Sequence, residues 1–214
     1  MDNSLFRWFN RLANRTGWAH GFFTTFADFG IAIFAVLLLS AYLIGRKRDV
    51  LRIIAGSVWA GAAALVALGI GQIIGGAIDR LRPYEAMTGV HVLVDKTTDF
   101  SIPSDHATAA GAVAVGLFLA HRRVGVIAVF AALLMAFTRV YVGAHYPGDV
   151  VAGLALGGLV AVVGHKLFVP ALTTLAQRLQ TTTLRPLVCA GRSAAIVATA
   201  SDASAAPLKP VMDS

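Results

Sequence analysis

The chain has 214 residues, of which 57% are hydrophobic and 14% are charged, and its mean hydropathy is +0.73. Soluble domains average about 45–50% apolar and about 25% charged residues, so this composition excludes an ordinary soluble domain and favours a polytopic membrane protein. The formal net charge is +7, but the basic residues form short clusters between apolar runs, without the interleaved aromatics of a nucleic-acid groove. Anionic lipid headgroups and phosphate substrates therefore fit this charge better than nucleic acid.

The first predicted element is an amphipathic helix within residues 1–20. Its apolar side chains fall at helical spacing on one face: Leu5, Trp8, Phe9 and Leu12. Arginines fall on another face: Arg7, Arg11 and Arg15. This pattern is typical of a helix that lies at the membrane interface. An ordinary amphipathic segment packed on the helix bundle is the alternative.

Five apolar runs follow, and each is predicted to form a membrane-spanning helix. In chain order they are residues 22–45, 53–78, 104–120, 124–141 and 147–169. The second run has no charge over about 39 Å of helix, more than the hydrocarbon core of about 30 Å. The uncharged cores of the last three runs have only about 15 residues each, but the polar residues that interrupt them gather at one end. The sequence therefore predicts an all-α, polytopic membrane helix bundle.

The domain organisation follows from these runs. Residues 21–170 form the predicted transmembrane domain, and residues 171–214 form a polar tail that is Ala/Ser-rich and predicted to be disordered from Ser193. More basic residues flank one side of the spans than the other. By the positive-inside tendency, the loop Asp79 to Pro103 faces away from the cytoplasm, although the amino-terminal arginines argue against this orientation. No feature indicates an oligomeric state.

Because successive spans alternate in direction, three polar segments are expected to meet at one face of the membrane. They are Arg82-Pro83 after the second span, Pro103 to His106 before the third, and Arg139 to Asp149 between the fourth and fifth. Any one of these residues alone is typical of a snorkelling side chain or a capped helix end. Two arginines and two histidines at one place instead predict an anion site, because guanidinium groups bind phosphate oxygens in bidentate fashion.

The second and third polar segments carry the predicted chemistry. Ser104 is a good N-cap, which leaves backbone N–H groups of the helix start free to bind an anion. Capping does not require a histidine, so His106 is a candidate for a catalytic role. Pro147 suits the first helical position, so His145 lies just outside the helix and Asp149 one turn inside it. A carboxylate that accepts the imidazole N–H would leave the other nitrogen as a nucleophile. A metal pair is the alternative, but the neighbouring arginines disfavour a dication, and no metal or cofactor is expected.

Together the three segments resemble the signature of the type 2 phosphatidic acid phosphatase (PAP2) superfamily, which is Lys-x6-Arg-Pro, Pro-Ser-Gly-His and Ser-Arg-x5-His-x3-Asp. In this chain they read Gly75-x6-Arg82-Pro83, Pro103-Ser-Asp-His106 and Thr138-Arg139-x5-His145-x3-Asp149. The resemblance implies that His145 attacks phosphorus to form a phosphohistidine, that His106 protonates the leaving group and that Asp149 orients His145. It also implies a set of phosphate ligands: Arg82, Arg139, Ser104 and backbone donors near Asp105.

The chain departs from this signature in ways that matter for its function. Gly75 replaces the lysine, and Arg80 and Lys96 are the candidate substitutes for that cation, although neither has the spacing of the family signature. Asp105 in place of glycine resembles the bacterial undecaprenyl-diphosphate phosphatase branch, which acts on a polyprenyl carrier lipid at the outer face of the cytoplasmic membrane and serves cell-wall biogenesis. The resemblance therefore implies undecaprenyl diphosphate as the substrate and a bilayer with anionic lipids as the surroundings.

Two alternative functions stay open at this point. The first is a phosphatidic acid or phosphatidylglycerol phosphate phosphatase, because acyl-chain pockets carry no distinctive residues. The second is a proton-coupled transporter that uses its histidines and aspartates as a relay. A transporter needs polar groups near the midplane of the membrane, whereas here they cluster at the helix ends.

Overall fold

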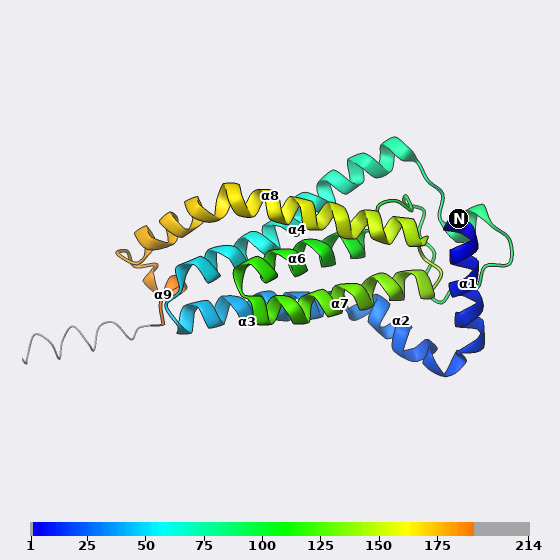
Figure 1. Ribbon diagram of the computed structural model, residues 1–214, viewed down its shortest axis with the longest axis horizontal. Coiled ribbons are helices and arrows are strands. Elements are labelled where there is room, and N and C mark those ends of the chain that lie inside the picture. The colour runs from blue at the N-terminus through cyan, green and yellow to red at the C-terminus, as the bar shows by residue number, and fades with distance from the viewer. Residues whose placement is uncertain (1, 191–214) are drawn as a thin grey trace, which may run out of the picture.

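The computed structural model describes residues 2–190, and these residues fold into an α-helical bundle that contains no strand (Figure 1). The elements are α1 (Asp2–Arg15), a 3-10 turn η1 (Gly17–Ala19), α2 (His20–Phe29), α3 (Ile31–Lys47), α4 (Leu51–Ile78), α5 (Pro83–Ala86), α6 (Asp105–Ala120), α7 (Arg122–Tyr141), α8 (Pro147–Leu179) and α9 (Arg185–Val188). The disorder predicted from Ser193 concerns residues outside the described ones.

The predicted spans correspond to α2–α3, α4, α6, α7 and α8. Among the described residues, α4, α7 and α8 are long and apolar enough to cross a membrane on their own. Helices α2 and α3 make a fourth span if counted together, with a bend of 56° between them. Helix α6 has 16 residues, which is about 24 Å and less than the hydrocarbon core of about 30 Å. The chain is thus a multi-pass membrane protein in which the third predicted span is a short helix.

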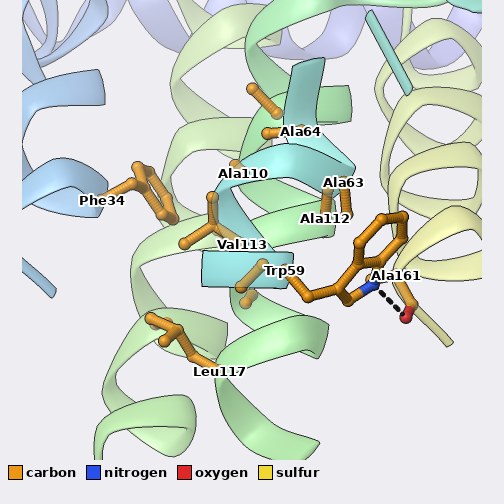
Figure 2. Packing of buried hydrophobic residues seen from close by; sticks show 14 of the residues in the cluster. Phe34, Trp59, Ala63, Ala64, Ala110, Ala112, Val113, Leu117 and Ala161 are labelled. Atoms are coloured by element: carbon orange, nitrogen blue, oxygen red, sulfur yellow. Dashed lines mark hydrogen bonds between the residues drawn. The ribbon is translucent and has the colours of Figure 1, made fainter. Parts of the chain in front are cut away.

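Helix α6 lies in the centre of the bundle, in contact with α4, α7 and α8. Small residues allow this close packing: a Cβ at Gly111 would lie 2.7 Å from the carbonyl oxygen of Leu154, and a Cβ at Gly153 equally close to that of Ser104. Figure 2 shows Trp59 of α4 reaching α8, where its indole N–H donates to the carbonyl of Ala161 at 3.0 Å. The approach at Gly153 brings the start of α8 against the start of α6.

Helix α1 lies across one end of the bundle, at a steep angle to the long helices (Figure 1). Phe6 is fully buried against Tyr146, with ring centroids 5.5 Å apart. Asn10 donates to the carbonyl of His91 at 2.7 Å and accepts from its N–H at 3.1 Å. Leu5 and Trp8 remain about half exposed. The helix is therefore packed on the bundle through one face, which agrees with the second interpretation, and it presents Leu5 and Trp8 outward. Contact of this outward face with the membrane stays a prediction.

The tail that was predicted to begin after Val169 starts as helix. Helix α8 continues through Pro170 to Leu179, and α9 follows. Residues 171–179 contain mainly good helix formers, and the helix tolerates the single donor that proline removes. The end of an apolar run therefore did not coincide with the end of the helix.

Candidate active site

The three predicted polar segments meet at the end of the bundle that α1 covers, where they line a cavity of about 810 Å³. Most of the predicted site residues reach this cavity: Arg82, Asp105, His106, Arg139 and His145. Ser104 and Asp149 are fully buried and do not line it. The lining is completed by Asp28 near the end of α2 and by side chains of the α5–α6 connection, which no sequence motif indicates.

A tight turn between α7 and α8 places His145. Gly143 has φ +82°, in the left-handed region, and a Cβ there would lie 2.6 Å from the carbonyl oxygen of His91. Tyr146 is extended (φ −74°, ψ 156°) and Pro147 begins α8, as the sequence predicts. His145 therefore lies outside both helices, yet only 1% of its surface is exposed.

The ring of His145 is held by a backbone carbonyl. Its Nδ1 lies 2.8 Å from the carbonyl oxygen of Ser101, whereas the nearest carboxylate oxygen of Asp149 is 3.9 Å away. Because a carbonyl oxygen only accepts, Nδ1 carries the hydrogen and Nε2 keeps its lone pair. That Nε2 lies 3.4 Å from Nη1 of Arg82. The direct hydrogen bond expected between His145 and Asp149 is not formed, because the loop before α6 supplies a closer acceptor.

Asp149 is instead connected to His145 by hydrogen bonds through Ser101. Its carboxylate accepts from the hydroxyl of Ser101 at 2.5 Å, from the N–H of Tyr146 at 2.9 Å and from Arg80 at 2.7 Å. One residue, Ser101, thus binds the carboxylate with its side chain and the imidazole with its backbone. The sequence offered no signal for this role, because Ser101 precedes the Pro103 segment within a loop of irregular structure.

The two arginines of the site differ in how they are held. Arg82 is 6% exposed, and its guanidinium donates to the side chain of Asp99 at 2.9 Å and to the carbonyls of Asp99 and Ala144 at 3.3 and 3.4 Å. Arg139 is 8% exposed, and its Nε has no hydrogen-bond partner within residues 2–190. One guanidinium is therefore fixed by the protein, and the other has donor capacity left for a ligand.

The electrostatics of this cavity keep His145 neutral. Burial, followed by the positive charges of Arg139 and Arg82, lowers the pKa of His145 well below its ordinary value. For Asp99, partial burial opposes ionisation, but the hydrogen bond from Thr97 and the charge of Arg82 outweigh it, so the pKa of Asp99 is lowered. At neutral pH the site thus presents an imidazole lone pair beside two cations.

The start of α6 provides further donors. Ser104 is the N-cap with extended backbone angles, as predicted, but its side chain forms no capping bond. The buried hydroxyl of Ser104 has no partner among the described residues. The carboxylate of Asp105 is turned to Gln72 of α4, whose amide donates to it at 3.0 and 3.1 Å. The free N–H groups of the first turn and the Ser104 hydroxyl therefore lie at the position where an anion binds a helix.

Nothing in the described part of the chain brings a lysine to the cavity in place of the one that Gly75 replaces. A Cβ at Gly75 would already lie 3.1 Å from both Phe100 and the carbonyl of Ile102. Arg80 is engaged with Asp2 and Asp149. Lys96 lies 5.7 Å from the centre of the Tyr84 ring and does not line the cavity. Residues 2–190 also contain no group of three or more His, Cys, Asp or Glu side chains suited to a metal ion.

Comparison with known proteins matches residues 56–172 to the PAP2 superfamily, a range that holds every predicted site residue. Undecaprenyl-diphosphatase BcrC of Bacillus subtilis is 29% identical over 156 residues, covering 73% of this chain and 78% of that protein. Decaprenylphosphoryl-5-phosphoribose phosphatase of Mycobacterium tuberculosis is 33% identical over 153 residues, covering 71% and 77%. The crystal structure of a transmembrane PAP2-type phosphatidylglycerolphosphate phosphatase from Bacillus subtilis shares the fold, with a TM-score of 0.58 at 20% identity over 79% of this chain and 85% of that one.

Proposed function

This chain belongs to the PAP2 superfamily and is a membrane phosphatase, and from that premise we propose that it hydrolyses a polyprenyl diphosphate, in the first instance undecaprenyl diphosphate, to the monophosphate. The observation that carries the proposal is the neutral, buried His145 facing Arg82 in a cavity that Arg139 also lines. Two relatives of similar length act, by their names, on polyprenyl-linked phosphates, which favours a polyprenyl chain over a glycerolipid.

The proposed reaction has two steps. Nε2 of His145 attacks the terminal phosphorus, the bond to the bridging oxygen breaks, and His106 gives the departing monophosphate a proton. Water then attacks the phosphohistidine, His106 takes up the proton, and inorganic phosphate leaves. Arg82, Arg139 and the free backbone N–H groups in the first turn of α6, whose residues Asp105 and His106 line the cavity, stabilise the negative charge on the phosphoryl oxygens in both steps. Ser101 and Asp149 hold the imidazole so that Nε2 keeps its lone pair.

The charge distribution of the bundle supports an extracytoplasmic active site in a bacterial cytoplasmic membrane. The end remote from the cavity, formed by the α3–α4 and α6–α7 connections, carries a cluster of basic residues: Arg46, Lys47, Arg48, Arg52, Arg122 and Arg123. Such clusters prefer the cytoplasmic side, where anionic lipids attract them. The cavity then opens on the opposite side.

A substrate panel tests this function directly. Purified full-length protein is given undecaprenyl diphosphate, phosphatidic acid or phosphatidylglycerol phosphate in detergent with excess chelator, and phosphate release is measured. We expect kcat/KM for the polyprenyl substrate to exceed the others by at least about tenfold. A preference for either glycerolipid would contradict the substrate assignment. Strict dependence on a divalent cation would contradict the metal-free mechanism.

Replacing Ser101 with alanine tests the link between Asp149 and His145. The variant keeps the carbonyl that binds Nδ1 but removes the hydroxyl that Asp149 accepts. Losing one hydrogen bond to a buried charged group costs about 1.5–3 kcal/mol, so we expect kcat to fall by about 10- to 100-fold. Ser40→Ala on α3, whose hydroxyl bonds only the carbonyl of Val36, is the matched control. Unchanged kcat for Ser101→Ala would contradict the link.

Replacing Asp99 with asparagine tests how Arg82 meets the substrate. The carboxylate of Asp99 occupies one Nη of Arg82, so a phosphate oxygen must displace it. Because the side chain of Asp99 is 49% exposed, water screens this ion pair and its contribution is about 0.2–1 kcal/mol, so we expect KM to fall by up to about fivefold. Asp95→Asn, at the same cavity, is the control for general loss of negative charge. A higher KM for Asp99→Asn alone would instead show that Asp99 holds Arg82 in place.

A further inference from the structure

The amino-terminal helix makes an ionic contact with the buried carboxylate of the site. One Nη of Arg80 lies 2.7 Å from Asp149, and the other lies 2.7 Å from Asp2, near the start of α1. The second carboxylate oxygen of Asp2 accepts from the N–H of Gly148, in the first turn of α8, at 2.9 Å. Two residues far apart in the chain, Asp2 and Asp149, therefore share one guanidinium at the start of α8.

Contacts with aromatic rings hold Asp2, Arg80 and Asp149 in this arrangement. The guanidinium of Arg80 stacks on the ring of Tyr146, 3.9 Å from its centre, and buried Phe6 of α1 packs against the same ring. A cation held over an aromatic ring and between two carboxylates has few other conformations available. Arg80 can thus fix the position of Asp149 as long as α1 stays packed on the bundle.

Asp149 needs such support because its side chain is fully buried. A buried carboxylate is destabilised unless charge or hydrogen bonds compensate it, and Arg80 supplies the only cation in ion-pair contact with it among the described residues. Asp2 balances the other face of Arg80, and the side chains of Arg80 and Asp2 are 28% and 31% exposed. Water therefore competes for this pair, while Asp2 gives Arg80 a second carboxylate contact at 2.7 Å.

We propose that Asp2 and Arg80 are positioning residues that hold Asp149, and through Ser101 the imidazole of His145, so that α1 is a working part of the active site. This proposal rests on the role of His145 as nucleophile given above. It assigns α1 a function beyond contact with the membrane. Neither residue touches the substrate, because neither lines the cavity.

Substitution of Asp2 gives the first test, by steady-state kinetics on the full chain. For Asp2→Asn we expect kcat to fall by about tenfold, with KM within about twofold, because only the orientation of the nucleophile changes. Asp2→Glu keeps the charge and should recover much of that loss. Asp49→Asn, the same substitution in the turn between α3 and α4 at the remote end, is the matched control. Equal loss in Asp2→Asn and Asp2→Glu, or a rise in KM alone, would overturn the proposal.

A tautomer measurement gives a second test that does not depend on any substrate. In protein labelled with ¹⁵N-histidine, the His145 signal is identified by its absence from His145→Asn, and its shifts report which nitrogen carries the hydrogen. We expect the Nδ1–H form in the wild type and a mixture of tautomers in Asp2→Asn and Arg80→Gln. An unchanged tautomer in both variants would overturn the proposal. A wild type that shows the Nδ1–H form but releases no phosphate would instead overturn the proposed function.

Discussion

Replacing His145 with asparagine is expected to abolish phosphate release, by at least about 10⁴-fold in kcat, because removal of a nucleophile leaves only binding and charge stabilisation. Asparagine is chosen because its amide N–H can replace Nδ1 as donor to the carbonyl of Ser101, which lies 2.8 Å from the ring. The attacking lone pair of Nε2 has no counterpart in asparagine. The measurement is release of inorganic phosphate, with alkali-quenched protein assayed for phosphohistidine, whose P–N bond is stable in base but not in acid.

The structure also explains why alanine is the poorer choice at this position. His145 lies outside the helices but is 1% exposed, so alanine would leave a cavity and an unpaired carbonyl, at about 1–3 kcal/mol. Its removal is thus not neutral for folding, although the sequence placed it in a connection. His165→Ala on α8, distant from the cavity, is the control for loss of a histidine. Substantial turnover by His145→Asn would exclude the proposed nucleophile.

Replacing Arg139 with methionine is expected to lower kcat/KM by about 10²–10³-fold while raising the thermal stability of the empty enzyme. Arg139 is 8% exposed and its Nε is unpaired within the described residues, so its charge is largely uncompensated until a phosphate binds. An apolar side chain of similar length removes that penalty. A gain of about 1 kcal/mol corresponds to about 2–4 °C in Tm for a chain of this size.

Opposite changes in activity and stability separate this role from a structural one. Arg123→Met, in the first turn of α7 and exposed at the other end, should change neither quantity appreciably. Thermal unfolding in detergent and kcat/KM are measured on the same preparations. If Arg139→Met lowered Tm together with activity, Arg139 would be part of the scaffold. If activity were retained, it would not be a phosphate ligand.

The position of the site could be predicted because it depends on helix direction. Spans that alternate across a membrane bring Arg82, Ser104 and His145 to one end whatever the details of packing, and the cost of burying charge in hydrocarbon keeps them at helix ends. The all-helical fold was also confirmed, and Pro147 begins α8 as predicted, because proline has a fixed φ and lacks the N–H that the first helical position leaves unpaired. These features follow from hydrophobicity and from the residue types at helix ends, and both can be read from a single sequence.

The hydrogen-bond partners of the site residues could not be predicted, because they depend on the conformation of the loops to within about an ångström. Spacing placed Asp149 one turn from His145, but the loop before α6 brings the carbonyl of Ser101 closer. Arg80 was a candidate for the missing cation of the cavity, yet it lies between Asp2 of α1 and Asp149 of α8 and pairs with both. The alternating direction of the spans thus specified which side chains gather at this end of the bundle. The packing of α1 against α8 and the course of the α5–α6 connection specified which atoms bind one another, because both depend on tertiary contacts.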